Sequence, residues 1–167
     1  MNGRILVAGI GNIFFGDDAF GVEVVRELMR RPLPDAVCVK DFGIRSYDLA
    51  YAIMDGYEAT ILIDAAPRGK PPGTLYLIEP DLDGIGRPGN IDAHRMDPVG
   101  VLQLVRTLGG RPGNLYLVGC EPGVLETDEI SLSPSVRAAV PQAVEMVVLL
   151  AGRLLNENPT PTALTGA

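Results

Sequence analysis

The chain has 167 residues, of which 47% are hydrophobic and 21% charged, a balance typical of a globular domain and not of a disordered chain. Its formal net charge is −7 and it has no cluster of lysines and arginines, so we expect no nucleic-acid partner. The apolar runs are shorter than the roughly 20 residues of a membrane-spanning helix. We therefore expect a cytoplasmic protein without a membrane partner, with one domain over residues 1–155 and a disordered tail over residues 156–167.

Strands and helices alternate in the first part of the chain. Apolar runs predict strands over residues 4–9, 36–41 and 60–64, and the last of these is the continuous kind that is buried on both faces of a sheet. Helical spacing predicts helices over residues 19–31 and 46–54. The inner face of the first helix is predicted to hold Phe20, Val24, Val25, Leu28 and Met29.

The second part of the chain continues the alternation with one reversal. A strand over residues 74–79 follows a connection of about eight residues, which is shorter than a parallel crossover requires, so this strand should run antiparallel. Asp97-Pro98 and Ser133-Pro134 each open a helix, and a strand over residues 114–119 lies between them. The fold class is therefore α/β, a three-layer sandwich around about five mostly parallel strands with one antiparallel edge strand.

The segment GIGNIFFGDDAFG, residues 9–21, begins like a nucleotide-binding turn but departs from its chemistry. Phe14 stands where the dinucleotide fingerprint requires its third glycine. Asp17 and Asp18 fall at the start of the following helix, where their charge would repel a phosphate. A nucleotide-binding Rossmann-like enzyme is therefore the weaker alternative, and the two aspartates either cap the helix or serve a site.

Polar residues at the carboxyl ends of the strands are the candidate site, because ligands of open α/β sheets bind there. Asp18, Asp64 and the lone histidine, His94, come from three different loops at this edge. Taken singly, each has a simpler explanation, as a helix cap, a turn residue or a surface histidine. Together, two carboxylates and an imidazole suit a divalent ion such as nickel or zinc, and they also suit general acid–base chemistry.

Four segments together resemble the hydrogenase maturation endopeptidases: GIGNIFFGDDAFG, LIDA, NIDAHRMDP and GCEP…LSPSV. The resemblance covers residues 4–150 and implies a five-stranded α/β sandwich. It implies an endopeptidase that removes the C-terminal extension from the precursor of a nickel-iron hydrogenase large subunit after nickel insertion. By this resemblance the metal contacts fall on Asp18, Asp64 and His94, which are also the candidate catalytic residues, and the nickel arrives with the substrate. Another divalent ion could occupy the same site in the isolated protein.

The chain departs from the family pattern at two places. Asp17-Asp18 stands where the family often has Asp-Glu, and the run from Asp41 to Arg45 replaces an Asp-Gly-Gly-Thr turn. We assign substrate recognition to Asp41, Gly43 and Asn12, and we expect Phe14, Phe15 and Phe42 to be either docking residues or buried under the loops.

Two mechanisms stay open at this point. In one, the substrate's nickel polarises the scissile carbonyl or a water, and in the other it only positions the peptide while Asp18 or Asp41 activates water. The alternative function is a non-catalytic chaperone that binds the hydrogenase subunit through its nickel. In either case we expect a monomer that meets a large protein partner transiently.

Overall fold

A five-stranded sheet carries the fold, with its strands in the order β2-β1-β3-β5-β4. The computed structural model describes residues 4–80, 98–123, 125 and 130–157. The strands are β1 (Ile5–Ile10), β2 (Val37–Gly43), β3 (Ala59–Ala65), β4 (Leu75–Ile78) and β5 (Asn114–Cys120). The helices are the short 3-10 helix η1 (Gly16–Ala19), α1 (Phe20–Met29), α2 (Ser46–Ile53), α3 (Pro98–Thr107) and α4 (Pro134–Glu157).

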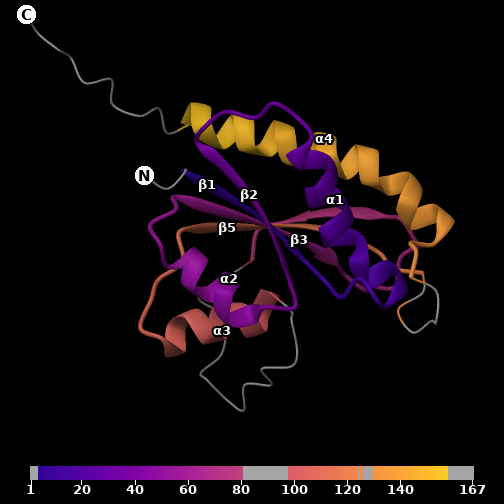
Figure 1. The fold of residues 1–167 in the computed structure, drawn as a ribbon, viewed down its shortest axis with the longest axis horizontal. Helices are drawn as coiled ribbons and strands as arrows, with labels where there is room; N and C mark the ends of the chain where they lie inside the picture. Colours follow the sequence, from indigo (N-terminus) through magenta and orange to yellow (C-terminus); the bar gives the residue numbers. More distant parts are fainter. Residues whose placement is uncertain (1–3, 81–97, 124, 126–129, 158–167) are drawn as a thin grey trace, which may run out of the picture.

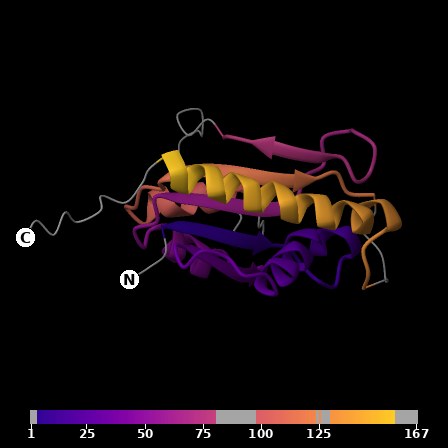
Figure 2. The same ribbon diagram turned by 90° about the horizontal axis from the view of Figure 1, so that it is seen from above.

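The arrangement confirms the predicted three-layer sandwich. Helices α1 and α4 lie on one side of the sheet, and α2 and α3 lie on the other (Figure 1). Strands β1, β2, β3 and β5 are parallel, whereas β4 runs antiparallel to β5 at one edge of the sheet, as the short preceding connection predicted. Figure 2 shows β4 at the edge of the sheet opposite to α1. The division into a domain over residues 1–155 and a tail stays a prediction, since α4 ends at Glu157 and residues 158–167 lie outside the described part.

The two sides of the sheet have separate apolar cores, because successive side chains of a strand point to opposite faces. On β3, Ile61 and Ile63 pack toward α1 and α4, and Leu62 packs toward α2 and α3. Helix α1 buries four of the five residues predicted for its inner face. Met29 is the exception, because it ends the helix and faces a hollow beside the edge strand β2 instead of a covered part of the sheet.

Glycines allow the start of α1 to lie directly against the sheet. A Cβ atom at Gly21 would lie 2.1 Å from the carbonyl oxygen of Ile63 and 2.4 Å from that of Ile10. A Cβ atom at Gly11, whose φ is +143°, would lie 1.8 Å from the carbonyl oxygen of Asp18. Close helix–strand packing is the role of the third glycine in a dinucleotide fingerprint, and here Gly21 performs it seven residues after Phe14. The glycines therefore place the Asp18 turn at the end of the sheet.

Helix α4 is long and apolar enough to cross a membrane by length and composition alone, which the sequence analysis did not expect. The difference arises because Glu145 divides the apolar run in the sequence while the helix as a whole stays apolar. Its valines at 136, 144 and 147 are buried in the same core as α1 and β3, which is the arrangement of a core helix in a globular protein.

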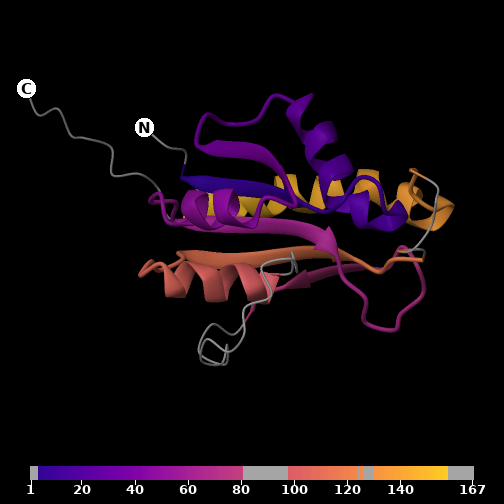
Figure 3. The same cartoon turned by 60° about the horizontal axis from the view of Figure 1, so that its bottom comes forward.

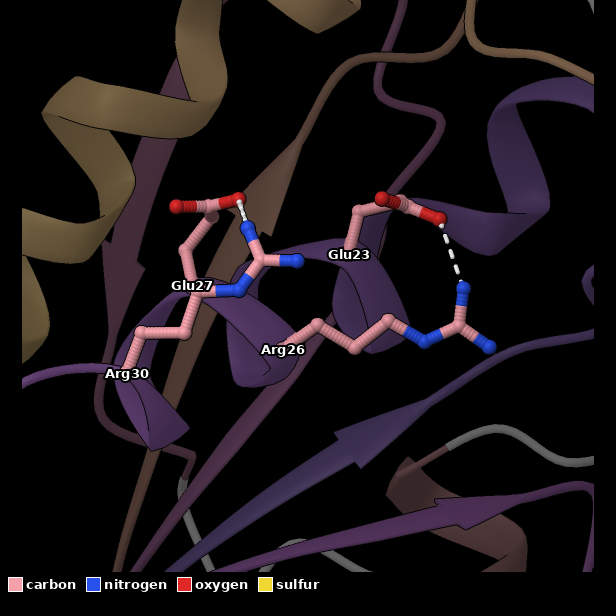
Figure 4. Close-up of polar contacts among 4 residues, drawn as sticks. All are labelled: Glu23, Arg26, Glu27 and Arg30. Carbon is pink, nitrogen blue, oxygen red and sulfur yellow. Dashed lines mark hydrogen bonds and ion pairs between the residues drawn. The ribbon is translucent and has the colours of Figure 1, made fainter.

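The outer face of α1 carries exposed ion pairs at i,i+3 spacing. Figure 4 shows Arg26 beside Glu23, with 3.1 Å between nitrogen and oxygen, and Arg30 beside Glu27, with 2.7 Å. Exposed pairs of this kind contribute about 0–1 kcal/mol each. The buried face therefore holds α1 in place, and these charges keep its outer surface in water.

Candidate functional site

The loops that follow β1, β3 and β5 meet at one end of the sheet (Figure 3). The strand register brings the ends of these strands level with one another. Gly9 of β1 pairs with both Asp41 of β2 and Ile63 of β3, and Asp64 pairs with Gly119 of β5. The helix η1, which carries Asp18, packs against β3. Asp18, Asp41 and Asp64 thus lie at the same edge of the sheet, as predicted.

Asp18 is fixed by the first residues of its own loop. The backbone N–H of Asn12 donates to Asp18 Oδ2 at 2.8 Å, and the N–H of Phe14 donates to Asn12 Oδ1 at 2.9 Å. The loop between β1 and η1 is therefore closed on itself, with a half-buried carboxylate at its end. Asn12 therefore holds the loop together, while its role in substrate recognition stays a prediction.

Asp64 is a buried carboxylate at the end of an apolar strand. Its five preceding residues in β3 are all buried, and Asp64 itself is 6% exposed. Alternation along β3 puts its side chain on the side of the sheet opposite to Ile63. Burying a carboxylate is unfavourable unless partners or a metal ion compensate, so this position is typical of a residue retained for a site or a polar network.

The third predicted ligand, His94, lies in residues 81–97, outside the described part of the chain. Among the residues that are described, no three His, Cys, Asp or Glu side chains are grouped so as to hold a metal ion. The set Asp18, Asp64 and His94 therefore stays a prediction, both for metal contact and for catalysis.

Asp17 does not cap a helix, and the capping alternative is wrong for it. Asp17 lies inside η1, whose N-cap residue is Phe15, and its carboxylate is fully buried. It accepts hydrogen bonds from the N–H of Gly123 at 2.8 Å, from the N–H of Ser133 at 2.6 Å and from the Ser133 hydroxyl at 2.7 Å. The two neighbouring aspartates are thus separated by task, since Asp17 anchors the segment before α4 and Asp18 stays at the sheet edge.

Glu121 is a further buried carboxylate at this end of the sheet, which the sequence analysis did not single out. It accepts hydrogen bonds from the N–H groups of Arg68 at 2.8 Å and Gly69 at 3.0 Å, and from the Tyr76 hydroxyl at 2.7 Å. The Arg68 guanidinium lies over the Tyr76 ring, 5.8 Å from its centroid. Glu121 therefore fixes the loop between β3 and β4. Its signal in the sequence was an acidic residue directly after an apolar strand, in GCEP.

The hydrogen bonds to Glu121 lower its pKa. Burial alone would raise the pKa of this carboxyl, but the Tyr76 hydroxyl and the backbone N–H groups of the loop outweigh burial and hold the pKa below its ordinary value. The same contact acts in reverse on the phenol, since burial and then the bond to Glu121 raise the pKa of Tyr76 to about 12.

We expect Glu121→Gln to lower the free energy of unfolding at pH 7, because the amide loses the charge that strengthens these bonds. The folded-state pKa of Glu121 is depressed, so its contribution is complete above the ordinary value of 4.5 and is lost as pH falls through the folded-state pKa. The difference between variant and unmodified protein should therefore shrink in acid. Urea unfolding at several pH values measures this, with Glu27→Gln in an exposed pair as the control. An equal difference at every pH would contradict the explanation.

A thiol nucleophile has no support at this end of the sheet. Cys120 is a buried free cysteine, and burial, followed by the nearby charges of Asp17 and Glu121, raises its pKa to about 11. A reactive cysteine needs a lowered pKa. Cys38 is also free and is partly buried.

The three predicted substrate-recognition residues line one hollow of about 310 Å³ beside Asp18. Asp41 Oδ1 accepts a hydrogen bond from the N–H of Gly43 at 2.9 Å, and Gly43 adopts φ +54°, a conformation that favours glycine. The N–H of Gly11 donates to the Gly43 carbonyl at 3.0 Å, which ties the ends of β1 and β2 together. Asn12 lines the facing wall.

The phenylalanines near this hollow divide into two groups. Phe14 is 63% exposed and Phe15 is 52% exposed, so both are available to a partner. Phe42 is 5% exposed and packs in the core with Leu49 and Ile53 of α2, so burial is confirmed for it and docking through it is wrong.

Comparison with known proteins identifies the family to which this α/β protein belongs. The family model described as "Hydrogenase maturation protease" matches residues 22–149. The hydrogenase 2 maturation protease of Escherichia coli is 35% identical over 147 residues, which cover 87% of this chain and 88% of that protein. The hydrogenase expression/formation protein HupD of Bradyrhizobium diazoefficiens is 33% identical over 145 residues, covering 86% and 75%.

Solved structures agree. The hydrogenase maturating endopeptidase HybD from Escherichia coli superposes with a TM-score of 0.73 at 29% identity, covering 90% of this chain and 93% of that one. The hydrogenase 2 maturation peptidase from a Thaumarchaeota archaeon gives a TM-score of 0.69 at 35% identity, covering 89% and 98%. The chain belongs to the hydrogenase maturation protease family, and it is a peptidase.

Proposed function

We propose that this peptidase removes the C-terminal extension from the precursor of a nickel-iron hydrogenase large subunit, and that it recognises nickel already bound to that precursor. The observation that carries the proposal is the buried Asp64 at the end of β3, beside the turn that fixes Asp18. Two carboxylates at one sheet edge suit a divalent ion, and His94 would complete the set with an imidazole.

Nickel is part of the substrate in this proposal. Bound to the precursor, it supplies positive charge close to the scissile peptide. Asp18 and Asp64 would hold that charged end of the precursor at the sheet edge, where the hydrogen bond from Asn12 keeps Asp18 in place. In the alternative where nickel only positions the peptide, Asp18 or Asp41 is the candidate to accept a proton from the attacking water.

We further propose that the enzyme acts as a cytoplasmic monomer. A net charge of −7 favours a protein that stays dispersed and meets its large partner transiently. Sedimentation of the protein alone, and with its precursor, would measure this directly.

The experiment for the function is mass spectrometry of the large-subunit precursor from the same organism, with and without nickel, after incubation with this protein. We expect loss of a short C-terminal peptide only from the nickel-loaded precursor, and not with the His94→Ala variant. Cleavage that ignores nickel would contradict the recognition step. Tight binding without any cleavage would favour the chaperone alternative.

A further inference from the structure

Strand β2 is terminal in the sheet order, so none of the described residues pairs with it on its outer side. A broad hollow of about 810 Å³ runs beside this edge. It is lined by Met29 from α1, by Lys40 and Asp41 from β2 itself, and by Tyr51 and Asp55 from α2 and the residues after it. The edge is therefore accessible along a groove with one helix on each side.

The ladder geometry shows which backbone groups point into this groove. The N–H of Ile5 donates to the carbonyl of Ala36, and Ile5 pairs with Val37 in the parallel register. In a parallel ladder, successive residues of one strand point their N–H and C=O groups alternately toward and away from the neighbouring strand. The β2 residues that pair with Ile5, Val7 and Gly9 therefore turn these groups outward, and they are Val37, Val39 and Asp41. The N–H of Val37 already donates a hydrogen bond to the carbonyl of Pro34. The outward groups that remain for a partner strand lie mainly at Val39, with the N–H of Asp41 beyond it.

The groove continues into the hollow at the site. Asp41, Phe42 and Arg45 line both of them. The opposite wall of the second hollow is formed by Gly11, Asn12 and Phe14. Asn12, on that wall, donates its N–H to Asp18, so the second hollow reaches the Asp18 turn. A peptide that lies along β2 can therefore follow the surface from the groove to this turn.

We propose that an extended segment of the precursor pairs with the outer edge of β2 as an added parallel or antiparallel strand, and that this pairing leads the scissile bond to Asp18 and Asp64. The inference rests on the proposed function. Its occupant follows from continuity with the site, since only the polypeptide being cut must occupy both hollows.

The side chains along the edge fit such a segment better than a second copy of this chain. An extended peptide presents alternate side chains to opposite faces, and here Met29, 53% exposed, stands on one face while Tyr51, 57% exposed, stands on the other. Lys40 is exposed on the strand itself, and a lysine on an edge strand opposes pairing of identical edges. The backbone of β2 then supplies affinity, and the flanking side chains supply selectivity.

The test substitutes Val39→Pro, which removes the outward N–H and leaves the ladder to β1 intact. Proline is tolerated on an edge strand where its nitrogen faces solvent, so the variant should fold, as circular dichroism and thermal unfolding will report. We expect KM for the nickel-loaded precursor to rise about tenfold, with kcat nearly unchanged. The matched control is Val39→Ala, which keeps the N–H and should leave KM within about twofold.

A second readout follows the edge directly. Amide hydrogen exchange of the unmodified protein is measured by NMR with and without a nickel-loaded precursor whose residues at the scissile bond are substituted so that it stays uncut. We expect the exchange rates of the Val39 and Asp41 amides to fall about tenfold when the precursor is bound.

Three results would overturn the inference. Unchanged KM in Val39→Pro together with unchanged exchange at β2 would do so while leaving the proposed function standing, because the unmodified enzyme still cuts. Protection that rises with protein concentration in the absence of precursor would assign the edge to a second copy of this chain. Failure of the unmodified protein to bind and cut any nickel-loaded precursor would remove the proposed function and this inference together.

Discussion

Asp64→Asn is expected to slow processing of the nickel-loaded precursor by about 100- to 10,000-fold, the range associated with loss of a residue that acts on a proton or a charge at the reacting group. Asparagine keeps the size of the buried side chain at the end of β3 but removes its charge. The fold should survive, since the core strand around it is unchanged. Single-turnover cleavage followed by mass spectrometry gives the rate.

The matched control for this variant is Asp35→Asn. Asp35 is exposed and lies just before β2, at the amino end of the strand and therefore opposite to the site. The Asp35→Asn variant should process the precursor at the rate of the unmodified protein. An Asp64→Asn enzyme that also cuts at the full rate would exclude both mechanisms left open above, because each requires the carboxylate at the sheet edge.

Asp17→Ala is expected to lower the free energy of unfolding by roughly 3–5 kcal/mol, because three donors around the buried carboxylate lose their acceptor. The N–H groups of Gly123 and Ser133 would be left without their acceptor. For a chain of this length such a loss lowers Tm by roughly 6–20 °C. Urea and thermal unfolding measure both quantities.

Ser133→Ala separates the contributions at this cluster. It removes only the hydroxyl donor to Asp17 and leaves the backbone donors in place, so the expected loss is about 1–2 kcal/mol. If Asp17→Ala destabilised the protein no more than the exposed substitution Asp35→Ala, the anchoring role described for Asp17 would be wrong.

Most of the fold could be predicted from local patterns. The continuous apolar run of β3 and the helical spacing of α2 each gave an element within about two residues of its observed bounds. The direction of β4 followed from the length of one connection. Met29 was misplaced because periodicity reports which residues share a helix face, but not where the sheet beneath that face ends.

The candidate site also has a part that local patterns predict and a part that they do not. Asp18 and Asp64 could be predicted, because the rule that sites lie at the carboxyl ends of parallel strands needs only the strand ends. The partners of Asp17 and Glu121 could not be predicted, since they lie between 45 and 116 residues away in the chain, and such contacts leave no periodic trace. The resemblance to the maturation endopeptidases identified the family correctly. His94, the third residue expected at this end of the sheet, lies outside the described residues.

The bond between Asp17 and Ser133 has a consequence for the synthesis of this protein. The turn beside Asp18 is translated early, but its anchor before α4 is added 116 residues later. Contacts so distant in sequence form only after the intervening chain has left the ribosome. The Asp17 carboxylate therefore receives its hydrogen bonds from Gly123 and Ser133 only after both residues have been translated, so the turn beside Asp18 gains this anchor late in synthesis.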